Sequence, residues 1–301
     1  MAQVHAFFDF DDTLCSGDSI LFWLRFYYRK RPARRVFQLA NGIALIAFAL
    51  RLVDSHALKR VFLWPMAFEP VDALDRLAAE FVATDLAARL HVPVLRRLWT
   101  HHLLGHKVVI LSASATFYLK HLKSILPMAD IQGSELIWPE RVLSLPRYRD
   151  GNLRGENKLK RMGDLGYGAE AQALSFAYSD HYHDRFLLGF SEFPICVRPE
   201  RKLRRLAREK GWPVMDWEEP GRWPRWKVLL GKFASLVFAA GPGLPKTGSD
   251  PLKEAAGARE YAPEHVRALR ERVAAKYPGG QPSEIYAALF GAPRSERAGD
   301  L

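Results

Sequence analysis

The hydrophobic residues follow two patterns that alternate along the first two thirds of the chain. Short apolar runs with β-branched and aromatic side chains occupy residues 4–8, 107–111, 174–178 and 193–197. Apolar runs of this length are typical of strands that are buried on both faces of a parallel sheet. The segments between them are longer and carry helical spacing, so the order of elements predicts an α/β fold.

The predicted helices are placed by apolar spacing, capping residues and stop residues. They cover residues 20–28, 71–89, 115–125, 159–162 and 199–210. Asp18 or Ser19 can cap the first of these helices, and Gly211 stops the last. Residues 131–152 alternate short apolar pieces with Gly and Pro, which indicates short strands joined by tight turns.

Residues 36–50 form an apolar stretch in which only Gln38 and Asn41 are polar. A helix of this length spans about 22 Å, which is short of the ~30 Å hydrocarbon core of a bilayer. We therefore do not expect a simple transmembrane span. Two interpretations stay open: a helix buried in the protein, or a helix or hairpin that dips into one leaflet with the basic run 29–35 at the headgroups.

Composition adds a strong positive charge to this picture. The chain of 301 residues has 44 Lys and Arg against 33 Asp and Glu, a net charge of +11. This charge favours an anionic partner: phosphate esters, acidic lipid headgroups or nucleic acid. Cys15 and Cys196 lie in no metal-ligand or redox spacing, and we read no cleaved signal peptide. We expect a cytoplasmic protein, with two alternatives left open: free in the cytoplasm, or peripheral to or partly inserted at the inner face of the cytoplasmic membrane.

Acidic residues follow the first predicted strand directly. Ligands of open α/β sheets bind beyond the carboxyl ends of the strands, where Asp9 and Asp11 are expected. If the strand pleat persists to Asp11, both carboxylates point into one small volume. Two such charges repel each other, and burying them without a counter-charge is costly, so the pattern favours a divalent cation.

Polar residues with complementary chemistry follow later strands in order. They are Ser112 after 107–111, Lys158 after the Gly155 loop, and Asp180 and Asp184 after 174–178. Together with Asp9-x-Asp11-x-Thr13, these residues resemble the four motifs of the haloacid dehalogenase superfamily, over residues 4–217. His181 stands where that superfamily usually has a serine, which leaves the contacts with substrate in question.

The resemblance implies a role for each of these residues. Asp9 is the expected nucleophile, and Asp11 the acid that protonates the leaving alcohol and the base that activates water. Ser112, Lys158 and Thr13 are the expected phosphate contacts, with Lys158 also catalytic. Mg²⁺ is the expected cofactor. Its expected ligands are Asp9, the backbone carbonyl of Asp11, Asp180 and Asp184, the last directly or through water.

The resemblance also implies a domain organisation. A Rossmann-like parallel sheet core formed by residues 1–14 and 106–218 carries an inserted α-helical cap, residues 15–105, which is the topology of subfamily IB. The aromatic and apolar cap resembles that of phosphatidylglycerophosphatase C-type proteins. Residues 219–301 form an expected helical C-terminal extension, in which residues 226–240 have the composition of an amphipathic membrane helix. Packing of that helix against the core is the open alternative.

The predicted function is a Mg²⁺-dependent phosphomonoesterase acting through an aspartyl-phosphate, on a membrane-borne phosphate such as phosphatidylglycerophosphate. One alternative is a soluble phosphatase for a small metabolite, similar to phosphoserine phosphatase. A second is a non-catalytic protein that binds anionic lipid or nucleic acid. The chain shows no aromatic and basic array of a nucleic-acid module, so nucleic acid is not an expected partner.

Overall fold

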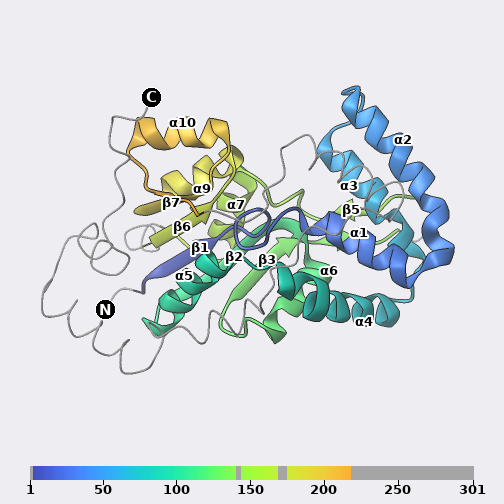
Figure 1. Cartoon of the computed structure of the whole chain (residues 1–301), viewed down its shortest axis with the longest axis horizontal. Helices are drawn as coiled ribbons and strands as arrows, with labels where there is room; N and C mark the ends of the chain where they lie inside the picture. Colours follow the sequence, from blue (N-terminus) through green and yellow to red (C-terminus); the bar gives the residue numbers. More distant parts are fainter. Residues whose placement is uncertain (1–2, 140–143, 169–174, 218–301) are drawn as a thin grey trace, which may run out of the picture.

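A six-stranded parallel sheet forms the centre of the molecule (Figure 1). The computed structural model describes residues 3–139, 144–168 and 175–217. The strands lie in the order β3-β2-β1-β6-β7-β8, and every pair of neighbours is parallel. Their bounds are β1 His5–Phe8, β2 Lys107–Ala115, β3 Asp130–Ser134, β6 Ser175–Ser179, β7 Phe193–Val197 and β8 Val214–Met215. The predicted α/β fold is therefore confirmed.

The four strands predicted from apolar runs are all present. Three of them agree with the structure to within one residue at each end, whereas β2 runs four residues beyond the predicted 107–111. The segment 131–152 contributes β3 and an antiparallel pair, β4 Leu136–Ile137 and β5 Arg147–Tyr148. The alternation of apolar pieces with Gly and Pro in that segment thus correctly predicted short strands.

Alternate residues of the central strand enter two separate hydrophobic cores, one on each face of the sheet. Phe8 joins a large core with side chains of the helices between β1 and β2, among them α5 Val92–Leu103. Phe7 joins a smaller core with side chains of α7 Glu156–Asp164, α9 Arg185–Phe190 and α10 Arg201–Lys210. Since successive side chains of a strand point to opposite faces, both faces of β1 are buried.

The chain between β1 and β2 is helical. It contains α1 Ser19–Lys30, α2 Phe37–Ala49, α3 Ser55–Leu63, α4 Val71–Phe81 and α5, joined by short helical turns at Pro32–Val36, Trp64–Phe68, Val82–Leu86 and Ala87–Arg89. Helix α1 begins as predicted, because the Asp18 side chain accepts a hydrogen bond from the Ile20 N–H. Figure 1 shows α1 to α4 beside the sheet, with α2 on the far side of this group.

Two predicted helices are interrupted. The predicted helix 71–89 is α4 followed by a π-helical and a 3₁₀ turn, and 115–125 is α6 Thr116–Leu119 followed by the 3₁₀ turn Lys120–Ser124. Apolar spacing does not reveal such changes in winding. The helix predicted after Gly155 is α7, which extends from Glu156 to Asp164, and α10 ends at Gly211 with φ of 69° as expected.

Helix α5 packs on the sheet although it lies within the range predicted for the cap. The His101 ring is fully buried, and its Nε2 lies 2.9 Å from the Tyr178 hydroxyl of β6. Leu95 and Leu98 of the same helix belong to the core of that face. Helix α5 therefore belongs to the hydrophobic core on that face of the sheet, and the boundary at residue 105 stays a prediction.

The apolar residues of α2 face outward. Among its residues only Asn41 is buried, whereas Leu39, Ile43 and Ile46 are 55–74% exposed. The interpretation of 36–50 as a buried helix is therefore wrong for its outer face. Within the described ranges, no helix combines the length and the apolar character needed to cross a membrane. The extension 219–301, with its amphipathic segment 226–240, lies outside the described residues.

Candidate active site

The strand order places the candidate site between β1 and β6. The order of the sheet runs backward from β3 to β1 and then continues with β6, so the direction of winding reverses between these two strands. Open α/β sheets bind their ligands beyond the strand ends at this reversal. Asp9 directly follows β1 and Asp180 directly follows β6. The topology thus brings together two acids that are far apart in the sequence.

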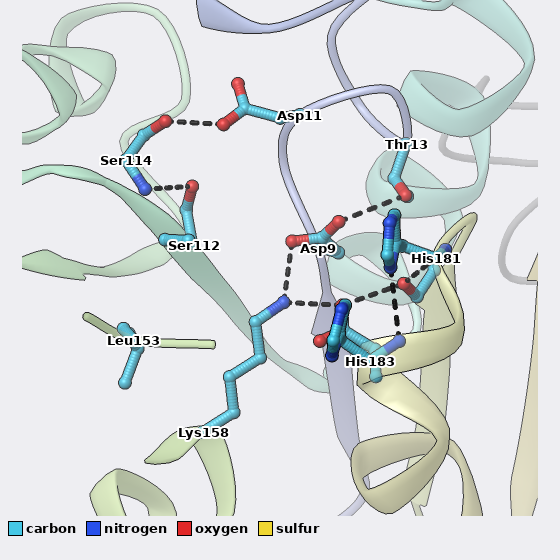
Figure 2. Close-up of polar contacts among 12 residues, drawn as sticks. Asp9, Asp11, Thr13, Ser112, Ser114, Leu153, Lys158, His181 and His183 are labelled. Carbon is cyan, nitrogen blue, oxygen red and sulfur yellow. Dashed lines mark hydrogen bonds and ion pairs between the residues drawn. The ribbon is translucent and has the colours of Figure 1, made fainter. Parts of the chain in front are cut away.

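Asp9 is held from three sides. Its backbone N–H donates to the carbonyl oxygen of Tyr178 at 2.9 Å, which fixes the end of β1 against β6. One carboxylate oxygen, Oδ1, lies 2.6 Å from Nζ of Lys158, and the other, Oδ2, lies 3.4 Å from Oγ1 of Thr13 (Figure 2). The side chain is only slightly exposed, at 7%. Asp9 therefore has a fixed orientation in a site that is almost closed to solvent.

Thr13 ties the two strand ends together. Its hydroxyl lies 3.1 Å from Oδ1 of Asp180 and accepts a hydrogen bond from the Asp180 N–H at 3.0 Å. The threonine is fully buried, and its own carbonyl oxygen contacts Nδ1 of His91 at 2.8 Å. The Thr13 hydroxyl thus contacts both Asp9 and Asp180, so the geometry gives Thr13 a positioning task beside the predicted phosphate contact.

Lys158 is buried between two carboxylates. Its Nζ lies 2.6 Å from Oδ1 of Asp9 and 2.6 Å from Oδ2 of Asp184, and only 1% of the residue is exposed. Asp184 is fixed further by the Ser179 hydroxyl, which donates to the same Oδ2 at 2.8 Å. Gly155, with φ of 60°, turns the chain into α7 just before the lysine. Lys160, on the same helix, is exposed as expected.

Asp11 does not share the partners of Asp9. The pleat of β1 ends at Phe8, and Asp12 has φ of 57°, so the chain turns instead of continuing as a strand. The Asp11 carboxylate accepts hydrogen bonds from the Ser19 N–H at 2.8 Å and from the Ser114 hydroxyl. The strand pleat thus does not persist to Asp11, and the two carboxylates have different hydrogen-bond partners.

Ser112 lies fully buried in β2, near Asp9 and Lys158 in Figure 2. Its hydroxyl oxygen accepts a hydrogen bond from the Ser114 N–H at 3.0 Å. A hydroxyl that accepts in this way still has its own proton to donate. Ser112 is thus equipped to donate to an oxygen atom of a ligand.

Negative charge is in excess at this site. Burial raises the pKa of Asp9 to about 7, although Lys158 pulls it down. Burial and the charge of Asp18 raise the pKa of Asp11 to about 6, and burial and Asp12 raise the pKa of Asp180 well above its usual range. Burial alone would lower the pKa of Lys158, but the two acids beside it raise the pKa overall. The lysine thus stays charged and does not neutralise all of the acids.

A divalent cation fits this excess of charge. In the described part of the chain, no group of three or more Asp, Glu, His or Cys side chains has the arrangement of a complete metal site. Mg²⁺, however, often takes only one or two carboxylates and completes its shell with waters and phosphate oxygens. Asp9 and Asp180 both approach the Thr13 hydroxyl, and burial, with other acids nearby, raises the pKa of both carboxyl groups. These two acids therefore suit Mg²⁺.

Residues 6–188 match the model of a family described as haloacid dehalogenase-like hydrolases. The match covers more than half of the chain and contains every site residue described above. The chain belongs to the haloacid dehalogenase-like hydrolase family. It is thus a hydrolase of that family, as the four motifs predicted.

Relatives with curated names include phosphatases of this family. A histidinol-phosphatase of Neisseria meningitidis is 22% identical over 71% of this chain and 98% of its own length. A probable phosphatase of Mycobacterium tuberculosis is 25% identical over 73% of this chain and 77% of its own.

A solved protein of unknown function from Bordetella pertussis superposes with a TM-score of 0.62 at 22% identity, over 72% of this chain and 99% of that one. A second solved structure, a hydrolase of the haloacid dehalogenase family from Salmonella enterica serovar Typhi, superposes with a TM-score of 0.50 at 14% identity. It covers 67% of this chain and 64% of that one. These structures share the fold.

Several polar residues around the predicted site were not anticipated. The hydroxyls of Ser19, Ser114 and Tyr118 gather near Asp11, and Ser179 and His91 support Asp184 and Thr13. Of these residues, only Ser114 could have been linked to the site from the sequence, because it is the second serine of Ser112-Ala113-Ser114 after the predicted strand 107–111.

The His181 side chain, at the position where the family usually has a serine, accepts a hydrogen bond from the His183 N–H at 3.1 Å. Its Nδ1 also lies 3.5 Å from Oε1 of Glu200. Both contacts join His181 to other residues of the chain, so in this geometry His181 stabilises the loop after β6.

Proposed function

We propose that the protein is a Mg²⁺-dependent phosphomonoesterase that acts through an aspartyl-phosphate on Asp9. The observation that carries this proposal is the grouping of Asp9, Lys158 and Asp180 at the reversal of the sheet, with Ser112 on the strand β2 that pairs with β1. A phosphate ester needs a nucleophile held in line and positive charge that offsets its own. The fixed orientation of Asp9 and the buried ammonium group of Lys158 provide both.

The reaction proceeds in two displacements. A carboxylate oxygen of Asp9 forms a bond to phosphorus while the bond to the leaving oxygen breaks, and Asp11 gives that oxygen its proton. Asp11 then takes a proton from water, whose oxygen attacks phosphorus and releases inorganic phosphate and free Asp9. Lys158 and the Ser112 hydroxyl hold the phosphoryl oxygens throughout.

The acids of the site hold the metal in this proposal. Asp9, the backbone carbonyl of Asp11 and Asp180 would hold Mg²⁺. Asp184 acts at a distance, since Lys158 and Ser179 already occupy one of its oxygens. When bound, the ion offsets the charge of the phosphoryl group and of the carboxylate that attacks it.

The position of the helical insertion supports membership of subfamily IB. The insertion follows the Asp9 motif directly and returns to the sheet before β2. We assign the cap to residues 15–90 and count α5 with the core, because His101 of α5 bonds to Tyr178 of the sheet. The apolar cap sequence retains its resemblance to phosphatidylglycerophosphatase C-type proteins.

We propose that the substrate is a phosphate monoester at a membrane surface, such as a phosphatidylglycerophosphate-like lipid. One face of α2 supports this location. Apolar residues recur there at helical spacing and are 55–74% exposed: Val36, Leu39, Ile43, Ile46 and Leu50. Arg35 and Arg51 are exposed at its two ends, and residues 29–53 contain no acid. An apolar helix face with flanking arginines is typical of helices that lie in the headgroup region of anionic bilayers.

A soluble substrate is the second candidate, and the histidinol-phosphatase relative favours it. That relative is matched over 98% of its length. Two separate measurements discriminate between the candidates. A membrane substrate predicts that the protein sediments with vesicles and hydrolyses lipid phosphate esters faster than soluble ones, while a metabolite phosphatase does neither.

The experiment that tests the catalytic proposal is a panel of lipid and soluble phosphate esters assayed with Mg²⁺ and with EDTA. We expect phosphate release that requires Mg²⁺ and that falls by at least about 1000-fold in Asp9→Asn. A protein that only binds anionic lipid or nucleic acid would release no phosphate, and its salt-sensitive binding would survive Asp9→Asn.

A further inference from the structure

A row of buried hydroxyls leads from the core to Asp11. The Tyr118 hydroxyl lies 2.9 Å from Oγ of Ser19, and that atom lies 2.8 Å from Oγ of Ser114. Ser114 in turn donates to Oδ2 of Asp11, as Figure 2 shows. Tyr118, Ser19 and Ser114 are all at most 2% exposed. Asp11 is thus the end of a hydroxyl chain that is closed to water.

The direction of each hydrogen bond in this chain follows from proton counting. A hydroxyl has one proton to donate. Ser114 uses its proton on Asp11, so it accepts from Ser19. Ser19 has then used its proton as well, so it accepts from Tyr118. Burial raises the pKa of Tyr118 well above its usual range, which keeps the phenol protonated as the first donor.

The chain joins three elements of the structure. Ser19 is the first residue of cap helix α1, Ser114 lies in β2 of the core, and Tyr118 lies in α6. Ser19 acts on both carboxylate oxygens of Asp11. Its hydroxyl bonds to Ser114, which donates to Oδ2, and its own N–H donates to Oδ1 at 2.8 Å. Both oxygens of Asp11 therefore depend on where the first turn of α1 sits.

We propose that Ser19, Ser114 and Tyr118 are positioning residues, which hold Asp11 in the orientation that protonates the leaving group and make that orientation depend on the docking of α1. The inference rests on the proposed phosphatase function. Asp11 needs such support because it lies on a turn, next to a residue with φ of 57°, and not on a strand. An acid that is free to rotate loses most of its advantage in proton transfer.

This role predicts a dependence on the leaving group. An alkoxide is a poor leaving group and needs the proton from Asp11. A p-nitrophenolate leaves as a stable anion and needs it much less. Weakening the hydroxyl chain should therefore slow the first displacement selectively for alkyl esters, whereas general damage to the fold would slow it for both esters.

The experiment compares Ser114→Ala and Tyr118→Phe with two controls. Ser191→Ala and Tyr28→Phe remove buried hydroxyls that bond elsewhere, to the Leu187 carbonyl and to Asn41. Each protein is assayed on p-nitrophenyl phosphate and on an alkyl phosphate that the wild type hydrolyses. The parameter compared is kcat/KM, because it reports the steps up to departure of the alcohol and not the later attack of water, in which Asp11 also takes part. We expect kcat/KM on the alkyl ester to fall about tenfold or more in the two test variants and kcat/KM on the aryl ester to fall less than about threefold. The controls should change neither reaction.

The double variant tests whether the hydroxyls act in series. If Tyr118 acts on Asp11 through Ser114, adding Tyr118→Phe to Ser114→Ala should cost little more than Ser114→Ala alone. If the losses of activity in the two single variants multiply in the double variant, the hydroxyls do not act in series. If activity falls equally on both esters, the positioning role is refuted. A wild type that releases phosphate from no ester would instead refute the proposed function, and the inference with it.

Discussion

The contact between Lys158 and its two carboxylates is the strongest charge interaction of the site. One ammonium group lies 2.6 Å from an oxygen of Asp9 and 2.6 Å from an oxygen of Asp184, in nearly complete burial. Removing one partner from a buried ionic group leaves the others without compensation. The lysine therefore serves the stability of the protein as well as the proposed binding of phosphate.

We predict that Lys158→Ala lowers both activity and stability. Loss of the ammonium group should reduce kcat about 100- to 1000-fold, because the phosphoryl oxygens lose a charged donor. The free energy of unfolding should fall by about 3–5 kcal/mol, because two buried acids lose their cation. Phosphate release and denaturant melts measure these changes. Lys160→Ala, two residues along and exposed, is the matched control and should match the wild type. An active Lys158→Ala would contradict the proposed role.

Sequence reasoning located the acids and the lysine better than it located their partners. The carboxyl ends of parallel strands meet at one edge of a sheet, so Asp9 and Asp180 could be brought together from the order of strands alone. The partners of Asp11 could not, because they depend on a turn with positive φ at Asp12 and on where α1 packs. Neither property has a pattern in the sequence.

At the scale of the element, α2 shows what apolar periodicity leaves undecided. Its sequence is apolar on all sides, so it fits both a buried helix and a helix at a lipid surface. The exposure of each residue distinguishes them: Leu39, Ile43 and Ile46 face outward, while Asn41 is buried and donates to the Tyr28 hydroxyl at 2.8 Å. Asn41 is thus inside and these three apolar residues are outside, while Phe37, Ala44 and Leu45 pack against the core.

We predict that the outer face of α2 binds anionic membranes. Replacing Leu39, Ile43 and Ile46 by Asn should reduce sedimentation with phosphatidylglycerol vesicles at least about tenfold, because burial of each side chain contributes about 1.5–3 kcal/mol. The arginines at the ends of the helix should make binding weaker at high salt.

The matched control for α2 is the pair Ile137→Asn and Leu165→Asn, which removes exposed apolar side chains away from this helix. This control should sediment like the wild type. Hydrolysis of p-nitrophenyl phosphate should be equal in all three proteins, which shows that the site is intact. If the α2 variant still sediments like the wild type, α2 is not the membrane contact.

At the scale of the whole molecule, the buried acids link stability to pH. Burial raises the pKa of Asp9 to about 7 in the folded protein, above its usual value near 4. The unfolded chain therefore releases this proton at a lower pH than the folded one. The stabilising effect of the bound proton is complete below about pH 4 and is lost as the pH rises through about 7.

We predict that metal-free protein melts at a lower temperature at pH 8 than at pH 5. Mg²⁺ should raise the melting temperature more at pH 8 than at pH 5, because carboxylates must lose their protons before they bind a metal. Thermal melts with EDTA and with Mg²⁺ at both values measure this. Asp9→Asn should reduce both effects. A gain from Mg²⁺ that is equal at the two pH values would argue against these acids as ligands.

The central position of β1 has a consequence for synthesis of the protein. His5 pairs with Lys107 on one side and with Ser175 on the other, 170 positions later. At about 5–20 residues per second, the ribosome needs roughly 10–35 s to supply that second neighbour. Until then the nascent chain carries a largely apolar strand with an open edge, which is the kind of segment that chaperones shield from aggregation.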